Sequence, residues 1–370
     1  MALLDQPDTL APLPRVGREI IGAIETSRLT GRGGASFPTA TKWRAVADRS
    51  RGDGVIVVNG AEGEPRSLKD GTLMSARPHL IVDGAFIAAR ALRARRIVLY
   101  TGERHTAARD SMLRALAQRS EPESRTVGVA NAPARYVAGA ETAAVHFINH
   151  GIATPTTVPP YPFARGVDGA PTLVQNVETL ANVAVLARTG KLPGTLLLTA
   201  AGAVARPGVV EVESGTTVAD VVARAGGPSE APRAVLVGGY FGRWMPASDA
   251  WALSLTQTTG IGCGVIGVLP QSRCPVCETA GIMRYLASES SAQCGPCFFG
   301  LRGLADVCTR ITRDESSPTD VQRLQRWAVD VRGRGACKHP DGAAIFLSSA
   351  LAVFEHEFAR HRPHDLRQAA

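Results

Sequence analysis

The cysteines of this chain are the residues best suited to chemistry, and they are gathered in its last third. They are Cys263, Cys274, Cys277, Cys294, Cys297, Cys308 and Cys337. Thiols that only filled hydrophobic cores would be scattered along the whole chain. Because thiolates are soft ligands that suit zinc and iron–sulfur clusters, the clustering predicts a C-terminal module that carries a metal or does redox chemistry.

Four of these cysteines form two C-x-x-C pairs, at 274–277 and 294–297. Their spacing, C-x2-C-x16-C-x2-C, fits a zinc ribbon. However, the residues between the pairs have the pattern of a helix, which would hold the pairs roughly 24 Å apart. A shared zinc ion is therefore disfavoured, and a site that binds no metal stays open. We expect Cys263 and Cys308 to be core residues.

A glycine-rich loop, TGRGGASFPTATKW, occupies residues 30–43. Gly31, Gly33 and Gly34 let the backbone approach a ligand closely, and its N–H groups can hold anionic oxygens. Lys42 could add a positive charge. The glycine spacing differs from that of the P-loop and of the dinucleotide fingerprint.

Polar residues follow a buried-strand pattern at Gly54–Gly60. Asn59, Glu62 and Glu64 would then lie at the carboxyl end of a strand, where open α/β sheets bind ligands. The stretches at 135–144 and 171–183 also place polar groups just before a predicted helix. Together these stretches predict a ligand site at one edge of a sheet.

The elements that would position these residues form three groups. A strand at 54–60, a helix at 79–94 and a strand at 95–102 predict a parallel α/β unit. Strands around an Arg-Pro-Gly turn and one short helix ending at Gly226–Gly227 follow, and no strand is expected after about residue 272. The last helix is predicted over 341–361. We therefore predict domains at 1–190 (α/β), 191–270 (small β) and 271–370 (helical).

Composition narrows the classes of protein. The chain has 41 Lys and Arg against 33 Asp and Glu, a net charge of +8, without a basic patch interleaved with aromatic residues. Nucleic acid is thus a poor candidate partner, whereas an acidic protein suits this charge. No run of eighteen apolar residues and no secretory signal is found, so we expect a cytoplasmic protein without a transmembrane segment.

The chain resembles the NADH-oxidising flavoprotein subunit of respiratory complex I and of related hydrogenases and formate dehydrogenases. The motifs GRGGASFPT…KW, N-x-x-EGEP, NVETLANV and CGPC occur in the family's order along essentially the whole chain. The resemblance implies a Rossmann-like α/β domain that binds FMN, a small β-grasp (SLBB) domain, and a helical bundle that carries a [4Fe–4S] cluster.

The resemblance also implies site residues. Glu62 and Glu64 would be catalytic, and with Phe37 they would contact NADH. Around FMN it places Gly31, Arg32, Gly33, Gly34, Lys42, Asn59, Glu62, Tyr136, Gly139, Glu141, Asn176 and Thr179. The cluster-ligand positions are Ser291, Cys294, Cys297 and Cys337, so a serine stands where the family has its first cysteine.

Other positions also depart from the family pattern. Ala61 and Ala140 replace two carboxylates on the flavin side, Gln175 replaces an asparagine, and Ala45 replaces an aromatic residue that helps to sandwich adenine. The segment 151–162 lacks the family's basic residues. On the NADH side, each missing interaction is worth roughly 1–3 kcal/mol of affinity. The residues expected around the flavin therefore match the family pattern better than those expected around NADH.

The fourth cluster ligand is left open by the sequence. Ser291 Oγ, water, a nearby side chain, or a thiolate from Cys274 or Cys277 could fill that position. We expect His339, two residues after Cys337, to be an exposed loop residue rather than a ligand.

The resulting hypothesis is an electron-transfer oxidoreductase subunit. It would pass electrons from NAD(P)H or another two-electron donor through FMN to the cluster and then to a partner. The expected partner is a ferredoxin-like carrier, together with a membrane reductase that would place the chain at the membrane surface. The alternative is a non-catalytic scaffold that has lost donor binding and the cluster.

Overall fold

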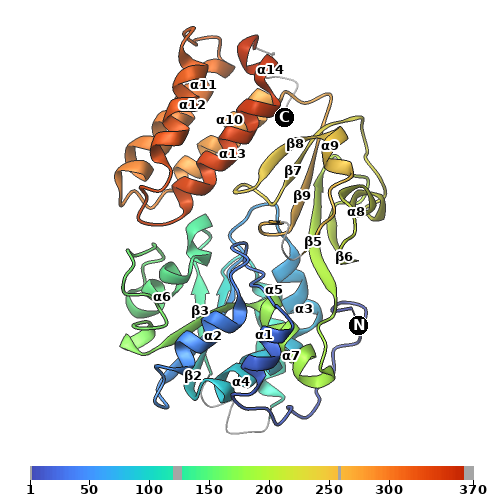
Figure 1. Cartoon of the computed structure of the whole chain (residues 1–370), viewed down its shortest axis with the longest axis vertical. Coiled ribbons are helices and arrows are strands. Elements are labelled where there is room, and N and C mark those ends of the chain that lie inside the picture. The colour runs from blue at the N-terminus through green and yellow to red at the C-terminus, as the bar shows by residue number, and fades with distance from the viewer. Residues whose placement is uncertain (1, 120–126, 257–259, 362–370) are drawn as a thin grey trace.

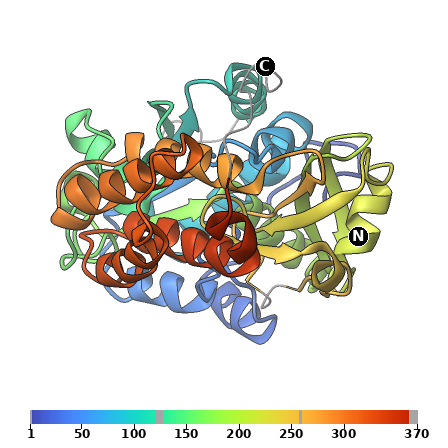
Figure 2. The same cartoon turned by 90° about the horizontal axis from the view of Figure 1, so that it is seen from above.

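A computed structural model describes residues 2–119, 127–256 and 260–361 of the chain. Figure 1 shows three modules: an α/β module at the bottom, a β module at the right, and a helical module at the top. Seen from above, in Figure 2, the helical module lies over the α/β module and the β module lies beside it at the right. This arrangement agrees with the fold class predicted from the sequence.

The α/β module is built on a parallel sheet in the order β3-β2-β1-β4. Its strands are β1 (Gly54–Gly60), β2 (Ala94–Gly102), β3 (Val127–Ala132) and β4 (Thr172–Asn176). Its helices are α1 (Ile20–Thr26), α2 (Thr39–Ala47), α3 (Lys69–Ala76), α4 (Pro78–Ala91), α5 (Thr106–Ala117), α6 (Glu141–His150) and α7 (Val177–Thr189). The predicted strand–helix–strand unit is thus present, as β1, α4 and β2.

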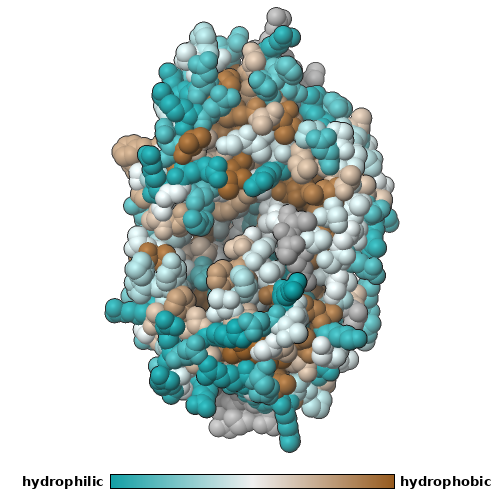
Figure 3. Space-filling view, viewed as in Figure 1, coloured by the Kyte–Doolittle hydropathy of each residue, from teal (hydrophilic) through white to brown (hydrophobic). Residues whose placement is uncertain are grey.

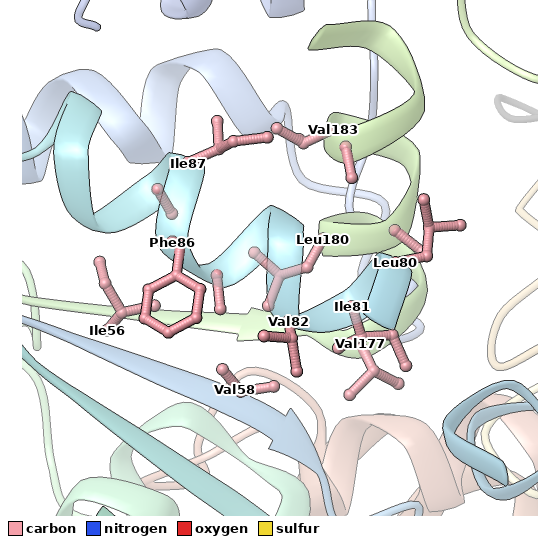
Figure 4. Close-up of a cluster of buried hydrophobic side chains, with 14 of the residues drawn as sticks. Ile56, Val58, Leu80, Ile81, Val82, Phe86, Ile87, Val177, Leu180 and Val183 are labelled. Atoms are coloured by element: carbon pink, nitrogen blue, oxygen red, sulfur yellow. The ribbon is translucent and has the colours of Figure 1, made fainter. Parts of the chain in front are cut away.

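Helices α4 and α7 cross each other over β1 and bury its apolar face. Figure 4 shows Ile81, Phe86 and Leu180 packed above Ile56 and Val58. The helices approach so closely that a Cβ added to Gly84 of α4 would lie 2.1 Å from the backbone oxygen of Leu180. Glycine is therefore required at this crossing.

The β module is a five-stranded sheet in the order β6-β5-β9-β7-β8. Its strands are β5 (Thr195–Gly202), β6 (Gly208–Glu213), β7 (Pro232–Val237), β8 (Arg243–Pro246) and β9 (Val265–Pro270). Besides the predicted helix, α8 (Val218–Arg224), it contains α9 (Ala247–Trp251). The prediction of one helix was wrong because α9 is too short for a helical periodicity to show in the sequence.

The helical module begins after β9, and no strand is found in the described residues beyond Pro270. It consists of α10 (Pro275–Ser288), a π-helical turn η4 (Pro296–Leu301), α11 (Arg302–Thr312), α12 (Asp320–Val331), α13 (His339–Val353) and α14 (Glu355–Ala359). The prediction of a single helix over 341–361 was wrong, because the helix is interrupted at Phe354, between α13 and α14. Phe354 and Phe358 are nevertheless both buried, so the apolar stripe continues across the break.

No helix in the described part of the chain is long and apolar enough to cross a membrane. The space-filling view in Figure 3 shows hydrophilic side chains concentrated toward the two ends of the molecule and paler residues across its waist. The waist is where the helical module meets the α/β and β modules.

Replacing Gly84 by alanine is expected to lower the free energy of unfolding by roughly 1–3 kcal/mol, because the new methyl group must push α4 and α7 apart. Urea denaturation followed by circular dichroism measures this change. Gly22→Ala on α1 is the matched control, because a Cβ there meets nothing within 4 Å. Equal stability of wild type and Gly84→Ala would contradict the close crossing.

Candidate functional site

The predicted ligand site lies at the carboxyl edge of the parallel sheet. Asn59 on β1 and Asn176 on β4 are paired neighbours there. Asn176 caps α7, because its Oδ1 accepts from the backbone N–H of Glu178 at 2.9 Å. Asn59 Nδ2 donates to the carbonyl of Gly139 at 2.9 Å. Three of the predicted polar stretches therefore meet at this edge.

The glycine-rich loop lies over the start of α7. The backbone N–H of Arg32 donates to Thr179 Oγ1 at 2.9 Å. A Cβ on Gly33 would lie 3.5 Å from the Cβ of Asn176, and Gly34 has a φ of +101°, which favours glycine. The structure thus brings the loop together with Asn176 and Thr179, as predicted.

Arg32 gives this edge buried hydrogen-bond donors that have no partner in the described part of the chain. Its side chain is buried, and its Nε lies 3.8 Å from Glu178 Oε1, too far for a hydrogen bond. Among the described residues, Arg32 Nε and Nη2 and the hydroxyls of Thr30 and Thr39 have no hydrogen-bond partner. Burial lowers the pKa of the guanidinium group, and Glu178 opposes that shift. Such a set of unused donors beside a glycine loop fits the phosphate of FMN.

A buried cluster of charged residues contacts Asn176 and Glu178 at this edge of the sheet. Lys69 Nζ lies 2.6 Å from Asp70 Oδ1 and 2.9 Å from Glu178 Oε2. Burial works against the lysine charge, but the two carboxylates outweigh it and raise the pKa of Lys69. Burial likewise raises the pKa of Asp70, whose Oδ2 accepts from Asn176 Nδ2 at 2.7 Å. Sequence reasoning missed these residues, although they lie within or beside the motifs that were singled out.

Glu62 and Glu64, the two predicted catalytic residues, are engaged within the chain. Glu62 accepts from the backbone N–H groups of Asp70 and Gly71, each at 2.9 Å, and so caps α3. Glu64 is 7% exposed and accepts from the Tyr136 hydroxyl at 3.1 Å and from Tyr240 N–H at 2.8 Å. Direct contact of either carboxylate with NADH stays a prediction.

Two further predicted residues pair with each other. Lys42 forms a salt bridge with Glu141 and donates to the carbonyl of Val174 at 2.5 Å.

Phe37, which was predicted to contact NADH, leaves 53% of its surface exposed beside the glycine loop. It is therefore accessible to a planar ligand.

Tyr136 connects this edge to the other two modules. Its ring packs against Phe241 and against His339, with centroids 4.6 Å and 5.7 Å away. Its backbone N–H donates to Glu289 Oε2 at 2.7 Å, just after α10. The α/β, β and helical modules thus meet around one side chain.

The predicted cluster cysteines lie on the same side of the helical module. Cys294 lies two residues before η4, Cys297 lies in its first turn, and Cys337 lies in the loop before α13. Burial raises the pKa of Cys297 to about 11, and the neighbouring Cys294 and Cys337 act in the same direction. These three described thiols do not all approach within the 4.8 Å expected for ligands of one ion. A cubane cluster binds each thiolate at a different iron, so its ligands need not converge on a single ion.

Two serines precede the cluster cysteines. The Ser290 side chain acts to lower the pKa of the Cys297 thiol, against the effect of burial. Ser291 is partly buried in the adjacent loop position. Its assignment as the fourth ligand remains a prediction.

Two expectations about single residues were wrong. His339 is 3% exposed, not an exposed loop residue, and its Nε2 is 2.7 Å from the carbonyl of Leu286. Cys263 is partly exposed rather than in the core, and its thiol donates to the carbonyl of Gly238 at 3.1 Å. The exposure of His339 and of Cys263 could not be predicted from the sequence, because each depends on contacts with a distant segment. Cys308 is fully buried, as predicted.

Cys274 and Cys277 lie at the opposite end of α10 from the cluster cysteines. Because α10 has 14 residues, it separates the two pairs by roughly 20 Å. Neither a zinc ion shared by the two pairs nor a fourth cluster thiolate from Cys274 or Cys277 is compatible with that separation. Both thiols instead lie beside His361.

Comparison with known proteins gives the same three modules. The model of the Nuo51 FMN-binding domain matches residues 24–185, and the SLBB domain matches residues 198–239. The iron–sulfur binding region of NADH-ubiquinone oxidoreductase-F matches residues 278–361.

Curated relatives align over nearly the whole chain. The F 2 subunit of NADH-quinone oxidoreductase from Rhizobium meliloti is 30% identical, covering 93% of this chain and 88% of the relative. The F subunit of the Escherichia coli enzyme is also 30% identical, with 92% and 83% covered. An NAD+-reducing [NiFe]-hydrogenase in the H2-reduced state superposes with a TM-score of 0.86 and 30% identity, over 98% of this chain and 66% of that one. The chain thus spans about two thirds of the solved hydrogenase chain.

The fold and the site define an oxidoreductase that carries FMN and a [4Fe–4S] cluster. Within that class, the chain belongs to the family of NADH-quinone oxidoreductase F subunits. The predicted family, fold class, cofactors and enzyme class are therefore confirmed.

Glu64 is expected to make stability depend on pH. Burial raises the pKa of its carboxyl group. As pH rises from below the ordinary value of about 4.3 through the raised value, the unfolded state releases the proton first, so the group contributes less to stability. The free energy of unfolding of wild type minus that of Glu64→Gln should fall by about 1.4 kcal/mol for each pH unit of that shift.

Urea denaturation at several pH values between about 4 and 7 measures this difference. Glu213→Gln, on the exposed end of β6, is the control for removing a surface carboxylate. A difference that stays constant or grows with pH would contradict the buried carboxyl group.

Proposed function

We propose that the chain oxidises NADH at FMN bound on the carboxyl edge of β1 and β4. Electrons then pass to a [4Fe–4S] cluster held by Cys294, Cys297 and Cys337, with Ser291 in the remaining ligand position. Bound at that edge, FMN would supply the conversion between two-electron hydride chemistry and one-electron transfer. The three matched modules and the names of the relatives support this proposal.

The observation that carries the proposal is the contact between the two redox regions. Tyr136, at the flavin edge, donates its N–H to Glu289, and Arg135 donates to the carbonyl of Ser290 at 3.3 Å. Ser290 begins the segment 290–297, here called the cluster loop, which carries Cys294 and Cys297. The carboxyl edge of β1 and β4, here called the flavin edge, is therefore hydrogen-bonded to the cluster loop. This contact favours short-range electron transfer between the two regions.

Each side chain at the flavin edge has a proposed role. The buried guanidinium of Arg32 and the N–H groups of Gly33 and Gly34 hold the phosphate. Asn176 fixes the start of α7, Asn59 holds the carbonyl of Gly139, and Lys42 is paired with Glu141. The predicted flavin residues Tyr136 and Gly139 border the same edge.

The dinucleotide would approach over the exposed ring of Phe37. Glu62 and Glu64 shape this face, and their existing hydrogen bonds support a role in positioning the loop over 61–68. The missing aromatic at Ala45 and the uncharged segment 151–162 weaken the contacts available to adenine and phosphate. We therefore propose a lower affinity for NADH than the full family pattern would give.

The acceptor of the electrons is proposed to be a partner subunit or carrier. The relatives are named as subunits, which supports a partner of some kind. The net charge of +8 favours a small acidic carrier such as a ferredoxin. A membrane reductase further along would place the chain at the membrane surface through that carrier.

Anaerobic titration with NADH tests the function. The purified protein is expected to show flavin and iron–sulfur absorbance, and NADH should bleach the flavin band. Arg32→Met should weaken FMN binding roughly 10- to 150-fold, because it removes a charged partner of the phosphate. Arg51→Ala, at an exposed position after α2, is the matched control. A colourless protein would instead support the non-catalytic scaffold, and an unbleached flavin would exclude NADH as direct donor.

Ser291→Cys is expected to supply a fourth thiolate and to make the cluster resist air and chelators longer than the wild-type cluster does, because thiolate binds iron more strongly than a hydroxyl or water. Iron and sulfide analysis with electron paramagnetic resonance measures this. Ser290→Ala should leave the iron content unchanged. Loss of iron in Ser290→Ala with no gain in Ser291→Cys would assign the ligand position to Ser290 instead.

A further inference from the structure

Three metal-binding side chains converge at the end of α10 that is remote from the cluster loop. Cys274 is the N-cap of α10, Cys277 lies in its first turn, and His361 follows α14. The Nε2 atom of His361 lies 3.4 Å from Cys274 Sγ and 3.7 Å from Cys277 Sγ. The three ligand atoms all lie within 4.8 Å of one another.

These separations match those of ligands on one tetrahedral metal ion. Zinc binds thiolate sulfur at about 2.3 Å and imidazole nitrogen at about 2.0–2.1 Å, which places such a sulfur and nitrogen about 3.6 Å apart. The two observed distances fall on either side of that value. The described cluster cysteines do not converge in this way, so the two sites differ in kind.

Hydrogen bonding alone does not account for the arrangement. A ring nitrogen of imidazole makes one strong hydrogen bond, yet two sulfur atoms face the same nitrogen here. In addition, the backbone N–H of Cys277 points at Cys274 Sγ, 3.4 Å away. An N–H group aimed at a sulfur stabilises the thiolate form that metals require.

We propose that Cys274, Cys277 and His361 bind one zinc ion, with a water molecule as the fourth ligand. Two thiolates and one imidazole are the nitrogen and sulfur ligands that zinc prefers. Each thiol releases its proton to solvent on binding, and no electron moves because zinc has no redox chemistry in proteins. The site stands apart from the electron path by the length of α10.

The ion would link the two segments at one end of the helical module. It joins the start of α10 to His361, two residues after the end of α14. Helix α14 is itself tied to the β module by Glu357 and Arg233, 2.9 Å apart. A metal at this place therefore stabilises the docking of the helical module against the sheet, independently of the flavin and the cluster. This role resembles that of structural zinc sites, which contribute folding energy directly.

Metal analysis of the whole chain tests the proposal. Wild type is expected to bind one equivalent of Zn2+ that Cys277→Ala and His361→Ala do not bind. His356→Ala, on the exposed side of α14, and Cys297→Ala, in the cluster loop, should keep that equivalent. Replacing Zn2+ by Co2+ should give the visible bands and thiolate charge-transfer absorption of a tetrahedral site, and these should vanish in the same two variants.

Thermal unfolding supplies a readout that does not depend on the electron path. Chelation should lower the unfolding temperature of wild type and His356→Ala, but leave that of Cys277→Ala unchanged. The proposal is overturned if reduced wild type binds no equivalent of Zn2+ or Co2+, or if Cys277→Ala and His361→Ala bind it as wild type does. A stable Cys274–Cys277 disulfide that forms no metal site after reduction also overturns it.

Discussion

The buried carboxylate of Glu64 is the contact on which the relative placement of the modules depends. It is nearly inaccessible to water, and it is stabilised by donors from two modules, the hydroxyl of Tyr136 and the N–H of Tyr240. A buried charged group is unfavourable unless it is fully hydrogen-bonded, so both donors must be in place together. Next to Tyr240, a Cβ on Gly239 would lie 2.7 Å from the carboxylate, so the close approach also requires glycine.

Buried polar and charged groups support the proposal that FMN binds at the carboxyl edge of β1 and β4. Lys69 is neutralised by Asp70 and Glu178, and this cluster anchors both α3 and the start of α7. Arg32 lies on top of the cluster with part of its guanidinium unsatisfied. The proposed phosphate of FMN would accept hydrogen bonds from these unused donors.

Helix α10 organises the helical module by separating two groups of thiols. Its C-terminal end leads through Glu289 to the cluster loop and to Tyr136, whereas its N-terminal end carries Cys274 and Cys277 beside His361. A helix of this length keeps the two groups too far apart to share a metal. One end can therefore serve electron transfer while the other end serves attachment to the β module.

The sequence alone determined the family, the three kinds of module and the cofactors, because these follow from local patterns. Glycine spacing, strand and helix periodicity and the cysteine motif act over a few residues, so they can be recognised without the fold. The ends of helices and the burial of single residues could not be predicted in this way. The break at Phe354, the burial of His339 and the partly exposed Cys263 depend on contacts with segments far away in the chain.

Only the tertiary structure decided which distant residues act together. It paired Lys42 with Glu141, enclosed Glu64 between two modules, and brought His361 to Cys274 and Cys277 across 87 and 84 positions of sequence. No local signal encodes such meetings, because they result from how α10 and α14 pack. Sequence could thus identify what the chain binds, while packing decided which side chains are available to bind it.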